Sequence, residues 1–277
     1  MEVVFKNVTV YRNYKSLIQK KLLSNIDMVI PKNKITAIYG DYNKNIIGPL
    51  ICALETPSVG SIIVGKHVIK RNKYINNIND LRFEVGYAPS DPRKYLFKKT
   101  VKAEVEYGMK HYKYRLNRIQ ERPLDALKLV GLDSSYEKRN PQNLSLSEQK
   151  KVMIASIIAY NPKIIIFDEI EKGLNNIDRN NIIRLIKTLK DKYQRTIILI
   201  SNDIEFIFKC FDHIYVIKES KLVFTCEISD LYNQNIDRHI QLPQIVDFVK
   251  KARNKGAKIE DFYEFNELIK GVYRDVK

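Results

Sequence analysis

Two adjacent carboxylates, Asp168 and Glu169, are the side chains whose types and spacing could do chemistry. They follow four large apolar residues, 164–167, and this pattern is typical of a buried strand. An aspartate in this position can hold Mg²⁺ through water, and the neighbouring glutamate can polarise a water that attacks a phosphate. A buried strand that ends in a solvated acidic turn gives the same letters, so this interpretation depends on the rest of the chain.

The loop at 40–47 follows an apolar strand at 35–39 and is the second candidate site. A phosphate-binding loop has the pattern Gly-x-x-x-x-Gly-Lys-Ser/Thr, in which backbone N–H groups and the lysine hold the phosphate. Here Asn45 stands at the second glycine, Ile46 at the lysine and Ile47 at the hydroxyl residue, so the usual cation and metal ligand are missing. The candidate nucleotide-binding residues of the loop are Gly40, Asp41, Tyr42, Asn43, Lys44, Asn45, Ile46 and Ile47.

Lys44 leaves one alternative open at this loop. It stands two positions before the expected lysine and would have to reach back around the loop to meet a phosphate. The Gly48–Pro49 pair suggests that the next helix begins late, because proline fits a first turn but not a helix interior.

Composition limits the class of protein. The chain has 277 residues, 44% of them hydrophobic and 29% charged, which suits one large soluble domain or a domain with an appendage. Its longest uncharged apolar stretch, 152–160, is much shorter than the roughly 20 residues that span a bilayer. The start of the chain is acidic and strand-like, so we expect no signal peptide. Three cysteines without metal-ligand spacing fit a reducing cytoplasm.

The net charge of +16 is spread along the chain rather than blocked. A basic surface suits the anionic face of a membrane, and a lysine-rich composition alone gives the same charge. Because the chain has no basic cluster interleaved with aromatic residues, we expect no nucleic-acid partner.

Apolar runs alternate with amphipathic helical patterns, which indicates an α/β sheet with parallel strands. The pattern is helical between about 92 and 145, which predicts an insertion, and helical again after 230. The strands are expected at 3–10, 26–30, 35–39, 61–64, 83–88, 164–167, 196–200 and 213–217, and the helices at 101–107, 124–130, 147–159, 178–189, 204–210, 242–253 and 259–269.

Four further segments, 85–92, 143–152, 172–175 and 201–203, have an order and spacing around 164–169 that resemble the nucleotide-binding subunit of ABC transporters. In that family they are the Q-loop, the signature loop, the D-loop and the switch loop, with Walker B at 164–169. The resemblance implies an α/β, P-loop NTPase (ABC ATPase) core at 1–230, with a helical subdomain at about 92–145 and a C-terminal helical appendage at 231–277.

The segment 91–108 is similar to the run that follows the Q-loop in energy-coupling factor (ECF) ATPases, and 11–23 resembles the lead of their second ATPase subunit. The segment 242–246 and the helices after it resemble their C-terminal dimerisation segment. This implies ATP and Mg²⁺ as cofactors, with binding at the chain's own loop in doubt. It also implies a peripheral position on the cytoplasmic face of the cell membrane. The implied partners are a second ABC ATPase subunit, a transmembrane scaffold and a substrate-binding membrane subunit.

The chain departs from the family at several loops. Ser90 stands at the Q-loop glutamine, Asn202 at the switch histidine and Asn175 at the D-loop aspartate. Ser145 remains in the signature loop, where Ser145-x-x-Glu148 is also a helix capping box. Leu146 and Ser147 occupy the glycine positions of the signature, and Tyr11, Arg12 or Tyr14 could stack on a base. We expect Glu171 to be solvated.

The resemblance leaves Glu169 as the catalytic residue and Asp168 as the Mg²⁺ ligand through water. Three hypotheses follow: the degenerate ATPase subunit of an ECF-type importer, a non-catalytic scaffold or regulatory protein with this fold, and an ATPase that works through Lys44. The first predicts weak or absent intrinsic hydrolysis.

Overall fold

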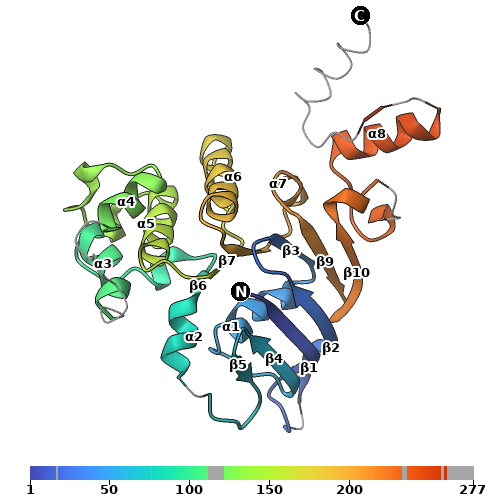
Figure 1. Ribbon diagram of the computed structural model, residues 1–277, viewed down its shortest axis with the longest axis horizontal. Coiled ribbons are helices and arrows are strands. Elements are labelled where there is room, and N and C mark those ends of the chain that lie inside the picture. Colours follow the sequence, from blue (N-terminus) through green and yellow to red (C-terminus); the bar gives the residue numbers. More distant parts are fainter. Residues whose placement is uncertain (17, 76, 112–121, 233–235, 257–258, 261–277) are drawn as a thin grey trace, which may run out of the picture.

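The computed structural model describes residues 1–16, 18–75, 77–111, 122–232, 236–256 and 259–260. Two sheets lie at the centre, with helices on one side and a helical region at one end (Figure 1). Strands run from β1 to β10 and helices from α1 to α8 along the chain.

The larger sheet has six strands in the order β10-β9-β3-β8-β7-β6. Its strands are parallel from β9 to β6, and only β10 pairs antiparallel, with β9. All five residues of β7 and of β8 are buried, as expected for parallel strands that are covered on both faces. The bounds are β3 Ile35–Gly40, β6 Val85–Ala88, β7 Ile164–Asp168, β8 Thr196–Ile200, β9 His213–Lys218 and β10 Lys221–Glu227.

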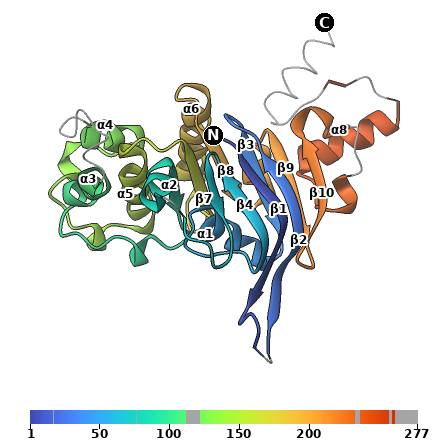
Figure 2. The same cartoon turned by 60° about the horizontal axis from the view of Figure 1, so that its bottom comes forward.

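The expectation of one parallel sheet is wrong for four strands near the start of the chain. These four strands form a separate antiparallel sheet in the order β2-β1-β4-β5, and Figure 2 shows β2, β1 and β4 side by side. Buried and more exposed residues tend to alternate along β1, which is typical of a sheet with one covered face. The bounds are β1 Val3–Arg12, β2 Lys20–Ile30, β4 Val59–Val64 and β5 His67–Ile69.

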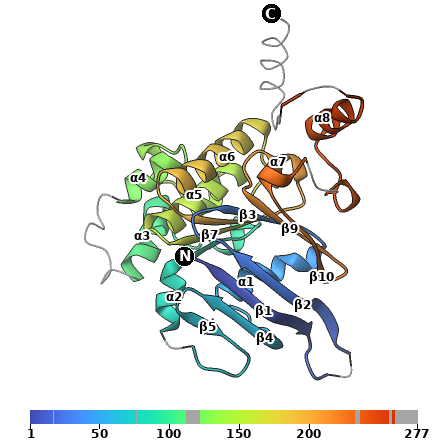
Figure 3. The ribbon, with the colours of Figure 1, turned by 45° about the vertical axis from the view of Figure 1, so that its right-hand side comes forward.

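Short helix α1, Ile47–Ile51, lies between the two sheets (Figure 3). Its side chains join a core cluster that contains Val3 and Phe5 of one sheet and Ile166 and Ile198 of the other. The loop at 40–47 therefore leads directly into the packed interface between the sheets.

The opposite face of the larger sheet is covered by helices from the second half of the chain. Residues such as Ile165 and Phe167 alternate with the residues of the first cluster and pack in a second cluster against α5, α6 and α7. Between 92 and 145 the described residues form helices and no strand, as predicted. The helices are α2 Ile78–Glu84, α3 Val101–His111, α4 Arg122–Leu129, α5 Leu146–Ala159, α6 Asn176–Asp191 and α7 Ile204–Phe208, with short 3-10 helices at Pro92–Lys94, Ser134–Tyr136 and Pro141–Asn143.

The chain after β10 forms two 3-10 helices, Ile228–Asp230 and Ile236–Arg238, and helix α8, Gln244–Asn254. Helix α8 matches the helix expected at 242–253, and Val246 packs into the main core. The helix expected at 259–269 lies outside the described residues except for its first two. Of the helices in the described part of the chain, none has the length and apolar character needed to cross a membrane.

Candidate nucleotide-binding site

Asp168 and Glu169 lie at the carboxyl end of β7, between the ends of β6 and β8. This edge is where ligands bind in open α/β sheets. Both carboxylates are buried, with 4% of each residue exposed. Glu169 has a φ of 49°, and its N–H donates to the carbonyl of Ile200 at 2.8 Å, so the backbone of the pair is held against the neighbouring strand.

Asp168 has a partner that the sequence did not reveal. The hydroxyl of Tyr87, on β6, donates to Asp168 Oδ2 at 2.8 Å, while Asp168 Oδ1 is buried with no hydrogen-bond partner among the described residues. Burial raises the pKa of Asp168 to about 6 and, with the adjacent carboxylate, raises that of Tyr87. The tyrosine ring also lies against Gly48 of α1, where an added Cβ would stand 2.6 Å from a ring carbon.

Glu169 is held by two lysines. Lys172 Nζ lies 2.5 Å from Glu169 Oε2, and Lys44 Nζ lies 3.8 Å from Glu169 Oε1. The side chain of Lys44 is completely buried, whereas that of Lys172 is 58% exposed. Burial lowers the pKa of Lys44, and the neighbouring carboxylates oppose that shift.

Several backbone N–H groups of the loop that leads to Lys44 are bonded within the protein. Residues Tyr42–Ile46 form a 3-10 helix, η1, that continues into α1. Three N–H groups of the loop donate within the protein: Gly40 to Asn202 Oδ1 at 3.2 Å, Asp41 to the carbonyl of Ile217 at 2.9 Å, and Lys44 to the carbonyl of Asp41 at 3.0 Å. Backbone N–H groups that already have protein partners cannot also hold a phosphate.

The side chains of Ile46 and Ile47 take part in the packing between the two sheets. Ile47 is fully buried in the cluster between the two sheets, and Ile46 packs against the same cluster. Apolar side chains are favoured in this position because α1 lies between the two sheets and is shielded from water. Lys44, which stands two positions before the expected lysine, supplies the buried one of the two ammonium groups beside Glu169.

Ser145 begins helix α5 as its N-cap. Its hydroxyl accepts from the Glu148 N–H at 3.3 Å, and the Glu148 carboxylate accepts from the Ser145 N–H at 2.8 Å. The capping-box interpretation is therefore confirmed. Leu146 is 39% exposed, and it lies so close to Gly173 that a Cβ there would stand 2.7 Å from Leu146 Cδ2.

The remaining predicted residues fall in different places. Asn202 reaches the loop through its bond to Gly40, and Ser90 is half-buried just after β6. The rings of Tyr11 and Tyr14 lie 5.6 Å apart, and the guanidinium of Arg71 lies 4.0 Å from the Tyr14 ring. Tyr14, one of the candidates for stacking on a base, therefore already has the Arg71 guanidinium over its ring.

Lys150, a buried lysine that was not predicted as part of the site, holds the carboxylate turn, which we define as residues 168–172. Lys150 Nζ donates to the carbonyls of Glu169, Ile170 and Lys172 at 3.4, 2.8 and 2.6 Å. Glu171, expected to be solvated, is 4% exposed and accepts a hydrogen bond from the Ser201 hydroxyl at 2.6 Å. Burial lowers the pKa of Lys150 to about 8 and raises that of Glu171.

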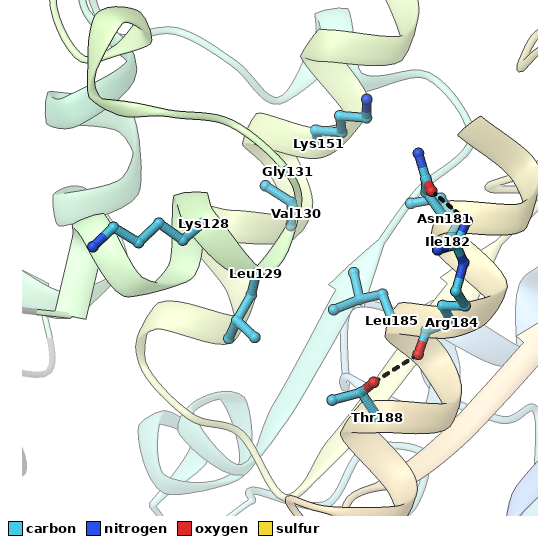
Figure 4. A pocket seen from close by; sticks show the side chains of 10 residues that line it. All are labelled: Lys128, Leu129, Val130, Gly131, Lys151, Asn181, Ile182, Arg184, Leu185 and Thr188. Atoms are coloured by element: carbon cyan, nitrogen blue, oxygen red, sulfur yellow. Dashed lines mark hydrogen bonds between the residues drawn. The ribbon is translucent and has the colours of Figure 1, made fainter. Parts of the chain in front are cut away.

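A separate pocket of about 280 Å³ lies where α4 and α5 meet α6 (Figure 4). Leu129 and Leu185 contribute apolar surface to it, and the side chain of Lys128 points away from α6. Lys151, at its edge, forms an ion pair with Asp178 at 2.8 Å. The pocket lies between the helical region and the core, apart from the carboxylates.

Comparison with known proteins agrees with this geometry. Residues 23–171, more than half of the chain, match the family model described as ABC transporter. The energy-coupling factor transporter ATP-binding protein EcfA2 of Clostridium acetobutylicum is 27% identical over 99% of this chain and 98% of its own length.

Two solved structures share the fold. A dimer of the ATP-binding cassette MJ0796, bound to ADP and Pi, has a TM-score of 0.74 at 22% identity and covers 82% of this chain and 98% of its own. The cbiO1 protein of Clostridium perfringens, described as part of the ABC transporter complex cbiONQ, has a TM-score of 0.71 at 24% identity and covers 90% and 98%. The expected α/β, P-loop NTPase fold and the resemblance to the second ECF ATPase subunit are confirmed. This chain belongs to the ABC transporter family.

Proposed function

We propose that this chain is an ATP-binding subunit of an ECF-type membrane importer and the degenerate member of an ATPase heterodimer. The observation that carries the proposal is the loop at 40–47, in which the Gly40, Asp41 and Lys44 N–H groups donate within the protein, in a chain that is similar to EcfA2 over almost its full length. Its own site then contributes little or no hydrolysis, and Glu169 has no attacking water to polarise.

The second nucleotide site of such a pair is built from the partner's phosphate-binding loop and this chain's segment 144–148. Ser145 is engaged in the capping box, and Leu146 presents an apolar side chain beside Gly173. A side chain in a glycine position crowds the approach of a phosphate. We therefore infer that this composite site binds ATP and turns it over slowly.

The surface that would meet the membrane scaffold lies within 85–112. Phe97 and Tyr107 are 60% and 46% exposed, and their rings meet edge-to-face at 4.9 Å. The ammonium of Lys98 lies 4.6 Å and 4.0 Å from the two ring centres. Exposed aromatic side chains next to a cation suit an interface with a protein helix at the cytoplasmic face of a membrane.

Co-purification from the native membrane tests the proposal. We expect the tagged chain to bring down a second ABC ATPase, a transmembrane scaffold and a substrate-binding membrane subunit. A Phe97→Ser, Tyr107→Ser variant should lose the scaffold and keep the second ATPase, whereas the control Tyr74→Ser, at an 83% exposed site on the antiparallel-sheet side, should keep both. Recovery of the wild-type chain without membrane subunits would favour the alternative, a non-catalytic scaffold or regulatory protein with this fold.

Turnover measurements test the assignment of the degenerate site. The isolated chain should hydrolyse ATP at the background rate, and Glu169→Gln should leave the rate of the reconstituted pair unchanged. Robust hydrolysis by the isolated chain that Glu169→Gln abolishes would refute the assignment.

A further inference from the structure

Lys44 is a buried cation whose position is not explained by packing alone. Its side chain is 0% exposed, and its Nζ has no hydrogen-bond partner among the described residues. Glu169 Oε1 is 3.8 Å away, and Asp168 is the next largest source of attraction. A buried lysine without charged neighbours would be strongly unfavourable, so the two carboxylates are what hold it there.

Mg²⁺ does not fit the same residues. The metal requires oxygen ligands in near-octahedral geometry and keeps several waters. Here Tyr87 takes one oxygen of Asp168, and Lys172 and Lys44 take the two oxygens of Glu169, so that of the four oxygens of this pair only the buried Asp168 Oδ1 is left for a metal. Within the described residues, no group of three or more histidine, cysteine, aspartate or glutamate side chains is placed to hold a metal ion.

The local charge leads to the same conclusion. Asp168 and Glu169 together carry two negative charges, and Lys44 and Lys172 carry two positive ones. A divalent cation that enters without displacing a lysine finds no net negative charge to neutralise. The side chain of Lys172 is 58% exposed and can turn into solvent, whereas that of Lys44 is 0% exposed.

We propose that the Lys44 ammonium is the built-in counter-ion of this site and takes the place of the divalent cation between Asp168 and Glu169. This deepens the proposed function, because it explains how the degenerate site stays folded and closed without metal or nucleotide. The competing role, a displaced phosphate-binding lysine, is disfavoured by the burial of Nζ and by the internal bonding of the Gly40, Asp41 and Lys44 N–H groups.

Mn²⁺ binding to the isolated chain, followed by electron paramagnetic resonance without nucleotide, tests the proposal. We expect no saturable binding to the wild type and a new site in Lys44→Met that is at least about tenfold tighter than any binding to the wild type, because the substitution removes a unit positive charge 3.8 Å from Glu169. Lys172→Met is the matched control. This substitution removes the exposed ammonium that pairs with the same glutamate, and the gain in Mn²⁺ affinity should be much smaller.

Thermal unfolding provides a second measurement if Lys44→Met folds poorly. Mn²⁺ should raise the Tm of Lys44→Met or of Lys44→Gln and leave that of the wild type unchanged. If the wild type binds Mn²⁺, or binds Mg-ATP with an affinity that Lys44→Met abolishes, Lys44 is a ligand-binding lysine and the proposal fails. That failure is separate from failure of the proposed role in an importer, which co-purification tests.

Discussion

Replacing Lys150 with methionine should destabilise the chain more than any other single change to a lysine of α5. The substitution keeps much of the side-chain volume but removes an ammonium that donates to three carbonyls of residues 169–172. Hydrogen bonds from a charged donor contribute about 1.5 kcal/mol or more each, and a carbonyl left buried without a donor adds to the loss. Part of this loss in stability is offset, because the methionine side chain packs in the apolar surroundings and no charge has to be desolvated.

With two short bonds and one long bond lost, we expect the free energy of unfolding to fall by about 3 kcal/mol. Urea unfolding followed by circular dichroism should show a lower midpoint with an unchanged m value. Lys151→Met is the matched control, because the next residue makes a single ion pair with Asp178, and its loss should cost about 1 kcal/mol or less. Equal effects of the two substitutions, or a loss below about 1 kcal/mol for Lys150→Met, would refute the role given to Lys150.

Three further predictions concern the same part of the molecule. Tyr87→Phe removes the hydroxyl that donates to Asp168 and should lower the free energy of unfolding by about 1–2 kcal/mol in a denaturant titration. An unchanged free energy of unfolding would contradict a stabilising role for this hydrogen bond. Burial raises the pKa of Glu171, so the buried charge lowers the free energy of unfolding at neutral pH. This cost disappears as the pH falls through the folded-state pKa towards the unfolded-state pKa. The Tm of Glu171→Gln should therefore exceed that of the wild type most near pH 7, and the difference should vanish near pH 4. The double variant Leu146→Gly, Ser147→Gly should raise ATP turnover by the reconstituted pair severalfold in a phosphate-release assay, and an unchanged rate would show that crowding is not the limit.

The sequence predicted the parallel core and the insertion because their apolar runs are long and strongly periodic. It missed β10, whose residues are mostly exposed or half-buried, and β5, which has only three residues. The helix after the loop at 40–47 was expected to begin late because of Gly48–Pro49, whereas α1 begins at Ile47 and has the proline in its first turn. Assigning all strands to one sheet failed because hydropathy does not reveal which strands pair.

The site shows the same limit. Asp168 and Glu169 were found because they end a recognisable strand. Tyr87 and Lys150 could not be found, because each meets the carboxylate turn through a contact between segments distant in the chain. Lys44 stands two positions before the lysine of the phosphate-binding pattern, and the sequence does not show that the loop folds as the 3-10 helix η1. In the structure the Lys44 side chain reaches Glu169 from this helix.

The measurement that tests the central claim most directly is calorimetric titration of the isolated wild-type chain with Mg-ATP. If Lys44 fills the site and the Gly40, Asp41 and Lys44 N–H groups keep their internal bonds, the titration should show no saturable binding. Stoichiometric binding of one nucleotide per chain, lost in Lys44→Met, would contradict the account.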